Sequence, residues 1–153
     1  MSGNRFPSEL VQSPIFLLKK LGMTAKEQTV DAYEGTGHSP YHHAILAVLD
    51  EGLRETQGAI ADALGYDRGQ LVGLLDELEE RGLVERRRDP VDRRRHIVAV
   101  TAAGRSALED LRACARRVEE ELLAPLGAEE RAQLHGLLLR LAEEHLPHCA
   151  PPG

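Results

Sequence analysis

The sequence contains no tryptophan, and aromatic residues make up only 3% of its 153 residues. Its hydrophobic core must therefore consist mainly of leucine, alanine, valine and isoleucine, a composition that suits packed helices. The two cysteines, Cys114 and Cys149, are too few for a disulfide framework. A chain of this length can bury a substantial core, so we expect a single domain over residues 1–153.

Long apolar runs are also absent from the sequence. No stretch approaches the roughly 20 residues that a membrane-spanning helix requires. The start of the chain, MSGNRFPSEL, lacks the basic and apolar segments of a secretory signal peptide. We therefore expect a cytoplasmic protein with no membrane partner.

The net charge of −6 taken alone is unfavourable for a nucleic-acid partner. The charges are unevenly distributed, however, because residues 84–105 hold seven arginines against Glu85, Asp89 and Asp92. All fifteen basic residues after Lys26 are arginines, whose planar guanidinium suits bidentate contact with phosphate or guanine. Because binding depends on the local field, a basic stretch on an acidic body is compatible with DNA binding.

Start and stop signals predict six helices. Ser13-Pro14 and Ser39-Pro40 each combine an N-cap with a proline in the first turn. Apolar residues recur at helical spacing within each segment, and Gly65 separates the third helix from the fourth as the turn of a helix-turn-helix. The expected helices cover residues 14 to about 32, 40–51, 57–64, 68–81, 102 to near 125, and about 128–146.

Residues 84–101, VERRRDPVDRRRHIVAVT, predict a β-hairpin with a cationic tip. Two short runs rich in β-branched residues flank Asp89-Pro90, which is a turn signal, and the arginines 93–95 follow it. An arginine-rich hairpin next to a helix-turn-helix is suited to DNA. The helix enters the major groove, and the arginines reach phosphates or a minor groove.

This order of elements resembles the MarR family of winged helix-turn-helix transcriptional regulators. The segments that carry the resemblance are TQGAIADALGYDRGQLVGLLDELEERGLVERR (56–87) and DRRRHIVAVTAAGR (92–105). The family has an Asp-x-Arg at the wing tip and a later Thr-x-x-Gly, here Asp92-Arg93-Arg94 and Thr101-Ala102-Ala103-Gly104.

The resemblance implies a mainly α-helical fold with two regions. A winged helix-turn-helix lobe with a small β-hairpin wing would cover residues 39–103, and long N- and C-terminal dimerisation helices would cover 9–37 and 104–147. It also implies a homodimer on a palindromic double-stranded DNA operator, a repressor function, and release by a small aromatic or amphipathic effector. The leucine-rich fifth and sixth helices independently favour a two-fold partner.

The predicted DNA contacts come from the fourth helix, the start of the third and the hairpin. Gln70 can pair with adenine, Arg68 with guanine or phosphate, and Arg94, held by Asp92, is the candidate for the minor groove. A solvated helix face is the alternative for the helical residues, and Thr56 can equally be a simple cap. The predicted contacts are Thr56, Gln57, Arg68, Gly69, Gln70, Gly73, Arg86, Arg88, Asp92, Arg93, Arg94 and Arg95.

An effector pocket between the first, second and fifth helices follows from the resemblance. Its expected lining residues are Phe16, Leu17, Met23, Tyr41 and His42, with plain core packing as the alternative for each. Tyr41 and His42 would supply the polar groups.

No cofactor and no metal site are expected. His38 and His42 should not share a face because a helix begins between them, and His145, His148 and Cys149 lie close to the chain end. Cys114 should be buried among leucines. The sequence shows no nucleophile–base constellation, so we expect no enzyme. The alternatives are a winged-helix interaction scaffold that does not bind DNA, and a zinc- or redox-responsive regulator.

Overall fold

The computed structural model describes residues 5–52 and 56–147. Within these ranges the predicted architecture, mainly α-helical with a small hairpin, is confirmed. The elements in order are α1 (Ser8–Val11), α2 (Pro14–Glu34), α3 (Pro40–Glu51), α4 (Gln57–Leu64), α5 (Arg68–Glu80), β1 (Val84–Arg88), β2 (His96–Val100), α6 (Ala102–Leu122) and α7 (Ala128–His145).

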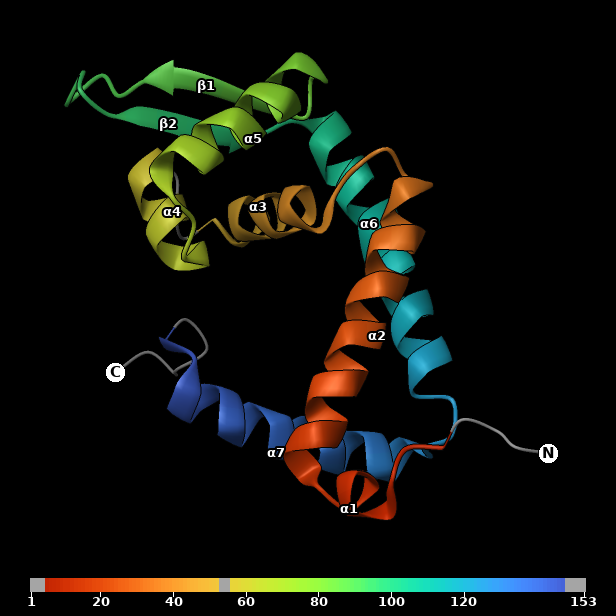
Figure 1. Cartoon of the computed structure of the whole chain (residues 1–153). Helices are drawn as coiled ribbons and strands as arrows, with labels where there is room; N and C mark the ends of the chain where they lie inside the picture. Colours follow the sequence, from red (N-terminus) through yellow and green to blue (C-terminus); the bar gives the residue numbers. More distant parts are fainter. Residues whose placement is uncertain (1–4, 53–55, 148–153) are drawn as a thin grey trace.

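Two long helices connect the two ends of the molecule. α2 and α6 pack against each other and form an arm (Figure 1). At one end of this arm α3, α4, α5 and the hairpin form what we call the lobe, and α1 and α7 lie at the other end. In the described part of the chain, no helix combines the length and apolar character needed to cross a membrane.

The helix starts follow the predicted caps. In each of five cases the cap side chain accepts a hydrogen bond from the backbone N–H three residues later, over 3.0–3.4 Å. The capping residues are Ser13, Ser39, Thr56, Asp67 and Thr101. α1 was not predicted, because its four residues are too few to show a helical periodicity. α2 extends about two residues beyond its predicted end.

The hydrophobic core lies in the lobe and the adjoining half of α6. α3, α4, α5, both strands and α6 all contribute to one cluster, and Cys114 is fully buried in it as predicted. The leucine face of α5 is buried, which fixes the opposite face toward solvent. The residues no more than 1% exposed include Ile45, Leu46, Ile60, Leu71, Leu75, Leu78, Val84, Val98, Leu108 and Leu111.

The apolar faces at the far end of the arm are uncovered. Ile15 is 74% exposed, Leu21 is 55% exposed and Leu137 is 57% exposed. No described residue of α7 is buried. These helices have the predicted apolar faces, but no other described part of the same chain covers them.

Val84, Val98 and Ile97 attach the hairpin to the rest of the lobe. β1 pairs antiparallel with β2, with Val84 opposite Val100 and Arg88 opposite His96. Val84 and Val98 are buried in the core, and Ile97 forms a bridge with Thr56 at the start of α4. The wing is therefore held beside the helix-turn-helix.

The Thr-x-x-Gly sequence fastens α6 to the end of the helix-turn-helix. The backbone N–H of Thr101 donates to the Leu83 carbonyl over 3.0 Å, and its hydroxyl donates to the Gly82 carbonyl over 2.7 Å. A Cβ atom added to Gly104 would lie 2.1 Å from the Leu83 carbonyl oxygen. Only glycine permits this approach of α6 to the backbone.

Replacement of this glycine tests the packing directly. Gly104→Ala should lower the free energy of unfolding by about 1–3 kcal/mol, because the methyl group forces the backbone apart. Gly73→Ala is the matched control, since an added Cβ there meets nothing within 4 Å. It should be neutral or stabilise the helix by up to about 1 kcal/mol. Urea denaturation at one protein concentration measures both, and equal stabilities would contradict the packing argument.

Candidate nucleic-acid interface

The exposed face of α5 carries the residues predicted to contact DNA. Gly65, in the left-handed conformation with φ 67°, ends α4, and Asp67 then caps α5. Because Leu71, Leu75 and Leu78 turn into the core, Arg68, Gln70 and the two glycines face solvent. The predicted positions of Arg68, Gly69, Gln70 and Gly73 thus lie on one accessible helix surface.

A hollow of about 460 Å³ connects the helix-turn-helix with the wing. Its wall includes Thr56 and Gln57 from the start of α4, Arg68 from α5, and Arg94 and Arg95 from the wing tip. The structure therefore brings together five predicted residues that lie up to 39 positions apart in the sequence. The result is a concave surface with three arginines on its rim.

The sequence analysis missed His96, which also lines this hollow. Its imidazole is exposed at the first position of β2. The sequence does offer a reason to include His96 among the candidate DNA contacts, because it directly follows Arg95 in the hairpin.

Asp92 organises the wing tip. It accepts hydrogen bonds from the backbone N–H of Arg94 over 3.1 Å and from its Nε over 3.2 Å, and Arg95 Nε lies 3.6 Å away. The hydrogen bonds from the Arg94 guanidinium and backbone lower the pKa of the Asp92 carboxyl. The predicted pairing of Arg94 with Asp92 is confirmed, and the Arg94 side chain remains 92% exposed.

Arg86 differs from the other arginines predicted to contact DNA. Its Nε and its backbone N–H both donate to Glu79 Oε2 over 3.1 Å, and its guanidinium also contacts Asp76. The side chain is only 18% exposed. Because both carboxylates lie on α5, Arg86 ties β1 to that helix, whereas Arg88 is exposed on the same strand face.

The five predicted effector-pocket residues do not form one cavity. The structure places Phe16 against Phe6 and Tyr41 against Tyr66, with ring centroids 5.0 and 5.5 Å apart. His42 is buried at the start of α3, near the opposite end of the arm from the beginning of α2. The residues concerned are Phe16, Leu17, Met23, Tyr41 and His42.

A cavity of about 620 Å³ lies instead between α2, α6 and α7. Its walls are mainly apolar and include Val118, Leu122 and Leu138. Arg131 and Tyr33 add polar groups, and the Tyr33 hydroxyl contacts His43 Nδ1 on α3 over 2.6 Å. The cavity is thus linked to the first helix of the lobe.

His38 and His42 lie on either side of the start of α3, so they do not share a helix face, as predicted. Their rings nevertheless lie edge to face with centroids 5.9 Å apart. His38 precedes α3, and the chain at the α2–α3 corner folds its ring over the first turn of the helix. The described residues hold no group of three metal-ligating side chains, and the predicted positions His148 and Cys149 lie outside them.

Comparison with known proteins decides the family. The family model described as "MarR family" matches residues 36–95, which cover most of the lobe. A regulatory protein named for the hcr operon of Thauera aromatica is 34% identical over 114 residues, covering 74% of this chain and 68% of that one. The chain belongs to the MarR family. The expectation of a transcriptional regulator and not an enzyme is thereby confirmed.

Solved structures of similar proteins share the fold over nearly the whole chain. The transcriptional repressor CouR, bound to a 23-mer DNA duplex, is 32% identical with a TM-score of 0.79, covering 92% of this chain and 99% of that one. CouR from Rhodococcus jostii RHA1 bound to p-coumaroyl-CoA gives 28% identity and a TM-score of 0.71, covering 87% and 94%. The winged helix-turn-helix fold is confirmed.

The contrast between Arg86 and Arg88 generates a stability prediction. Arg86→Ala should lower the free energy of unfolding by roughly 1.5–3 kcal/mol, because it removes charge-assisted hydrogen bonds to α5. Arg88→Ala removes the same charge from an exposed position and should change stability by less than about 0.5 kcal/mol. Urea denaturation compares the two variants. If both substitutions change the free energy of unfolding by the same small amount, Arg86 does not hold β1 to α5, and its predicted role as a phosphate contact is favoured again.

Proposed function

We propose that this MarR-family protein is a sequence-specific DNA-binding repressor that binds a palindromic operator as a homodimer. The observation that carries the proposal is the hollow in which Arg68 of α5 meets Arg94 and Arg95 of the wing. A polar helix face beside a cationic hairpin matches one major groove and its neighbouring minor groove.

α5 is the element that would enter the major groove. Gln70, at its exposed N-terminal end, can donate to and accept from an adenine edge, and Arg68 can contact guanine or phosphate. Nothing within 4 Å of Gly73 requires a glycine for packing inside the chain. Close approach of the α5 backbone to DNA supplies a reason for glycine at this position and at Gly69.

The wing and the start of α4 would hold the DNA backbone. Arg94 extends from the tip with its backbone fixed by Asp92, which suits insertion into a minor groove. Arg88, Arg93 and Arg95 would neutralise phosphates. The N-terminus of α4 offers Thr56, Gln57 and free backbone N–H groups for one more phosphate.

The uncovered apolar faces support a homodimer. α1, the start of α2 and α7 lie together at the end of the arm opposite the wing (Figure 1), and each carries exposed apolar side chains, among them Leu10, Ile15 and Leu137. Large exposed apolar side chains on neighbouring helices favour a protein partner, and a second copy in two-fold symmetry is the commonest solution. Such a dimer presents two α5 helices to successive major grooves about 34 Å apart.

We further propose that a small aromatic or amphipathic molecule releases the DNA. The 620 Å³ cavity between α2, α6 and α7 has mainly apolar walls, with polar groups from Thr29, Tyr33, Glu119, Glu120, Arg131 and His135, a combination that suits an amphipathic ligand. The contact of Tyr33 with His43 links it to the lobe. CouR, similar over nearly its whole length, has been solved both with DNA and with p-coumaroyl-CoA. A ligand shifts the equilibrium only if it prefers one of the two states.

Two variants distinguish the contribution of charge to DNA binding from the recognition of base sequence. Arg94→Ala should weaken binding to all duplexes and reduce the slope of log affinity against log salt by about one. Gln70→Ala should leave that slope unchanged and cost roughly 1–3 kcal/mol on a duplex that the wild-type chain enriches from random sequence. Fluorescence anisotropy at several salt concentrations measures both. A wild-type chain that binds no duplex would favour the alternative of a protein-interaction scaffold.

Release can be tested with parallel titrations of the protein–DNA complex. Salicylate, as a small phenol, should release the duplex, whereas zinc, EDTA and peroxide should not. Tyr33→Phe keeps the ring in the cavity wall but removes the hydroxyl contact with His43, so salicylate should still bind and release should require more of it. Release by micromolar zinc, by EDTA or by peroxide would favour the metal- or redox-responsive alternatives.

A further inference from the structure

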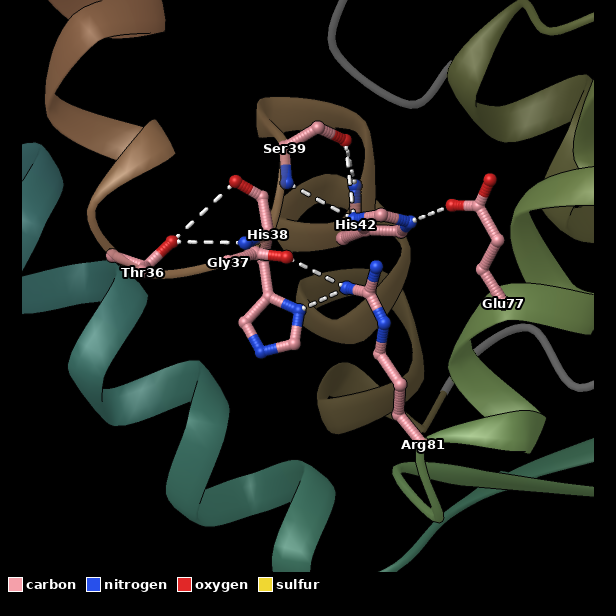
Figure 2. Close-up of polar contacts among 7 residues, drawn as sticks. All are labelled: Thr36, Gly37, His38, Ser39, His42, Glu77 and Arg81. Carbon is pink, nitrogen blue, oxygen red and sulfur yellow. Dashed lines mark hydrogen bonds and ion pairs between the residues drawn. The ribbon is translucent and has the colours of Figure 1, made fainter.

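The corner between α2 and α3 receives two side chains from the C-terminal end of the recognition helix α5: Glu77 in the helix and Arg81, the residue that caps it. Figure 2 shows Glu77 reaching His42 and Arg81 reaching Gly37 and His38. Glu77 and Arg81 are four residues apart and therefore lie on one face of α5. Both contacts come from its C-terminal half, away from the end that carries Arg68 and Gln70.

The neighbours of His42 determine the tautomer of its neutral ring. It is only 4% exposed, and the backbone N–H of Ser39 donates to its Nδ1 over 3.0 Å. Nδ1 therefore keeps its lone pair, and in the neutral ring the proton lies on Nε2, which donates to Glu77 Oε2 over 2.6 Å. Its backbone N–H also donates to Ser39 Oγ, which completes a capping box for α3.

Arg81 makes the second contact one turn further along α5. One guanidinium nitrogen donates to the Gly37 carbonyl over 2.8 Å and to His38 Nδ1 over 2.7 Å. Burial, then the charge of Arg81 and then His42, lower the pKa of His38. The lowered pKa favours the neutral ring, which is the form that can accept this hydrogen bond.

The corner is in turn fastened to the end of α2. The Thr36 hydroxyl donates to the Tyr33 carbonyl over 2.6 Å and accepts from the backbone N–H of His38 over 3.1 Å. A continuous set of hydrogen bonds therefore runs from the last turn of α2, in the arm, to the C-terminal half of α5.

We infer that His42, with Glu77, and Arg81, with the Gly37–His38 segment, are positioning residues that fix the angle of the recognition helix relative to the arm. The inference rests on the proposed binding of DNA by a homodimer. In such a dimer the arms set the distance between the two lobes. Because these contacts hold each α5 at one angle to its arm, the distance between the two α5 helices is fixed as well. The two contacts, of Glu77 with His42 and of Arg81 with the Gly37–His38 segment, thereby determine how strongly the protein prefers one half-site spacing over another.

The test compares binding to duplexes whose half-sites are separated by the preferred spacer or by one base pair more or less. The duplexes derive from a sequence that the wild-type chain enriches from random DNA. Wild-type protein should prefer one spacing sharply. Glu77→Ala and Glu77→Ala/Arg81→Ala should bind the preferred duplex roughly tenfold more weakly while binding the altered spacings about as well as before.

Two control variants accompany this comparison. Glu77→Gln keeps an acceptor for His42 Nε2 and should retain most of the spacing preference. Glu80→Ala removes the same charge from an exposed position on α5 and should keep the wild-type profile. Urea denaturation identifies any variant that fails to fold, and the single Glu77→Ala variant leaves the α3 capping box intact.

The outcomes separate the two proposals. A wild-type profile in Glu77→Ala, or an equal loss at every spacing, would overturn the positioning role. Failure of the wild-type chain to bind any duplex, or its binding as a monomer to one half-site, would instead overturn the proposed function.

Discussion

The lobe depends on the burial of one face of α5. Leu71, Leu75 and Leu78 are at most 1% exposed, and the helix packs against α3, α4 and β1. Burial of three leucines contributes about 1.5–3 kcal/mol each before the entropy of ordering is counted. Because this contact fixes the rotation of α5 about its own axis, it also determines which residues face outward, and those are the polar and glycine residues at 68–70 and 73.

Charged and polar side chains of α5 also contact two neighbouring elements. Asp76 and Glu79 pair with Arg86 of the wing, and Glu77 pairs with His42 of the α2–α3 corner. Three carboxylates of α5 are thus used within the chain. Two of the three are balanced by the Arg86 guanidinium, and the wing presents Arg94 outward, so in the proposed complex with DNA this part of the helix would carry less uncompensated negative charge than its sequence indicates.

The elements of the fold could be predicted because their signals are local. Ser13, Ser39, Thr56, Asp67 and Thr101 cap the expected helices, and Asp89-Pro90 marks the expected turn. The hydrogen bond at the wing tip could also be predicted, because its partners Asp92 and Arg94 are only two residues apart in the sequence.

The contacts between distant segments could not be predicted in the same way. His42 and Glu77 are 35 residues apart, and nothing near either residue indicates the other. Arg86 stands in a run of three arginines, so the sequence cannot show that it alone turns back to α5. The apolar pattern of α2 and α7 indicates that these faces are buried, but it does not show whether the same chain or a second copy covers them. The residues expected to line an effector pocket lie apart for a related reason, since the sequence does not show that α7 crosses the arm, where the cavity of about 620 Å³ lies.

In the proposed complex, two copies of α5 at a fixed separation contact DNA together. The most direct test is to select bound sequences from a random duplex library and then to footprint the protein on the most enriched sequence. The expected result is an inverted repeat with half-site centres about one helical turn apart, with major-groove protection flanked by minor-groove protection at the wing arginines. Enrichment of a single, unrepeated half-site, or of no sequence at all, would contradict the account.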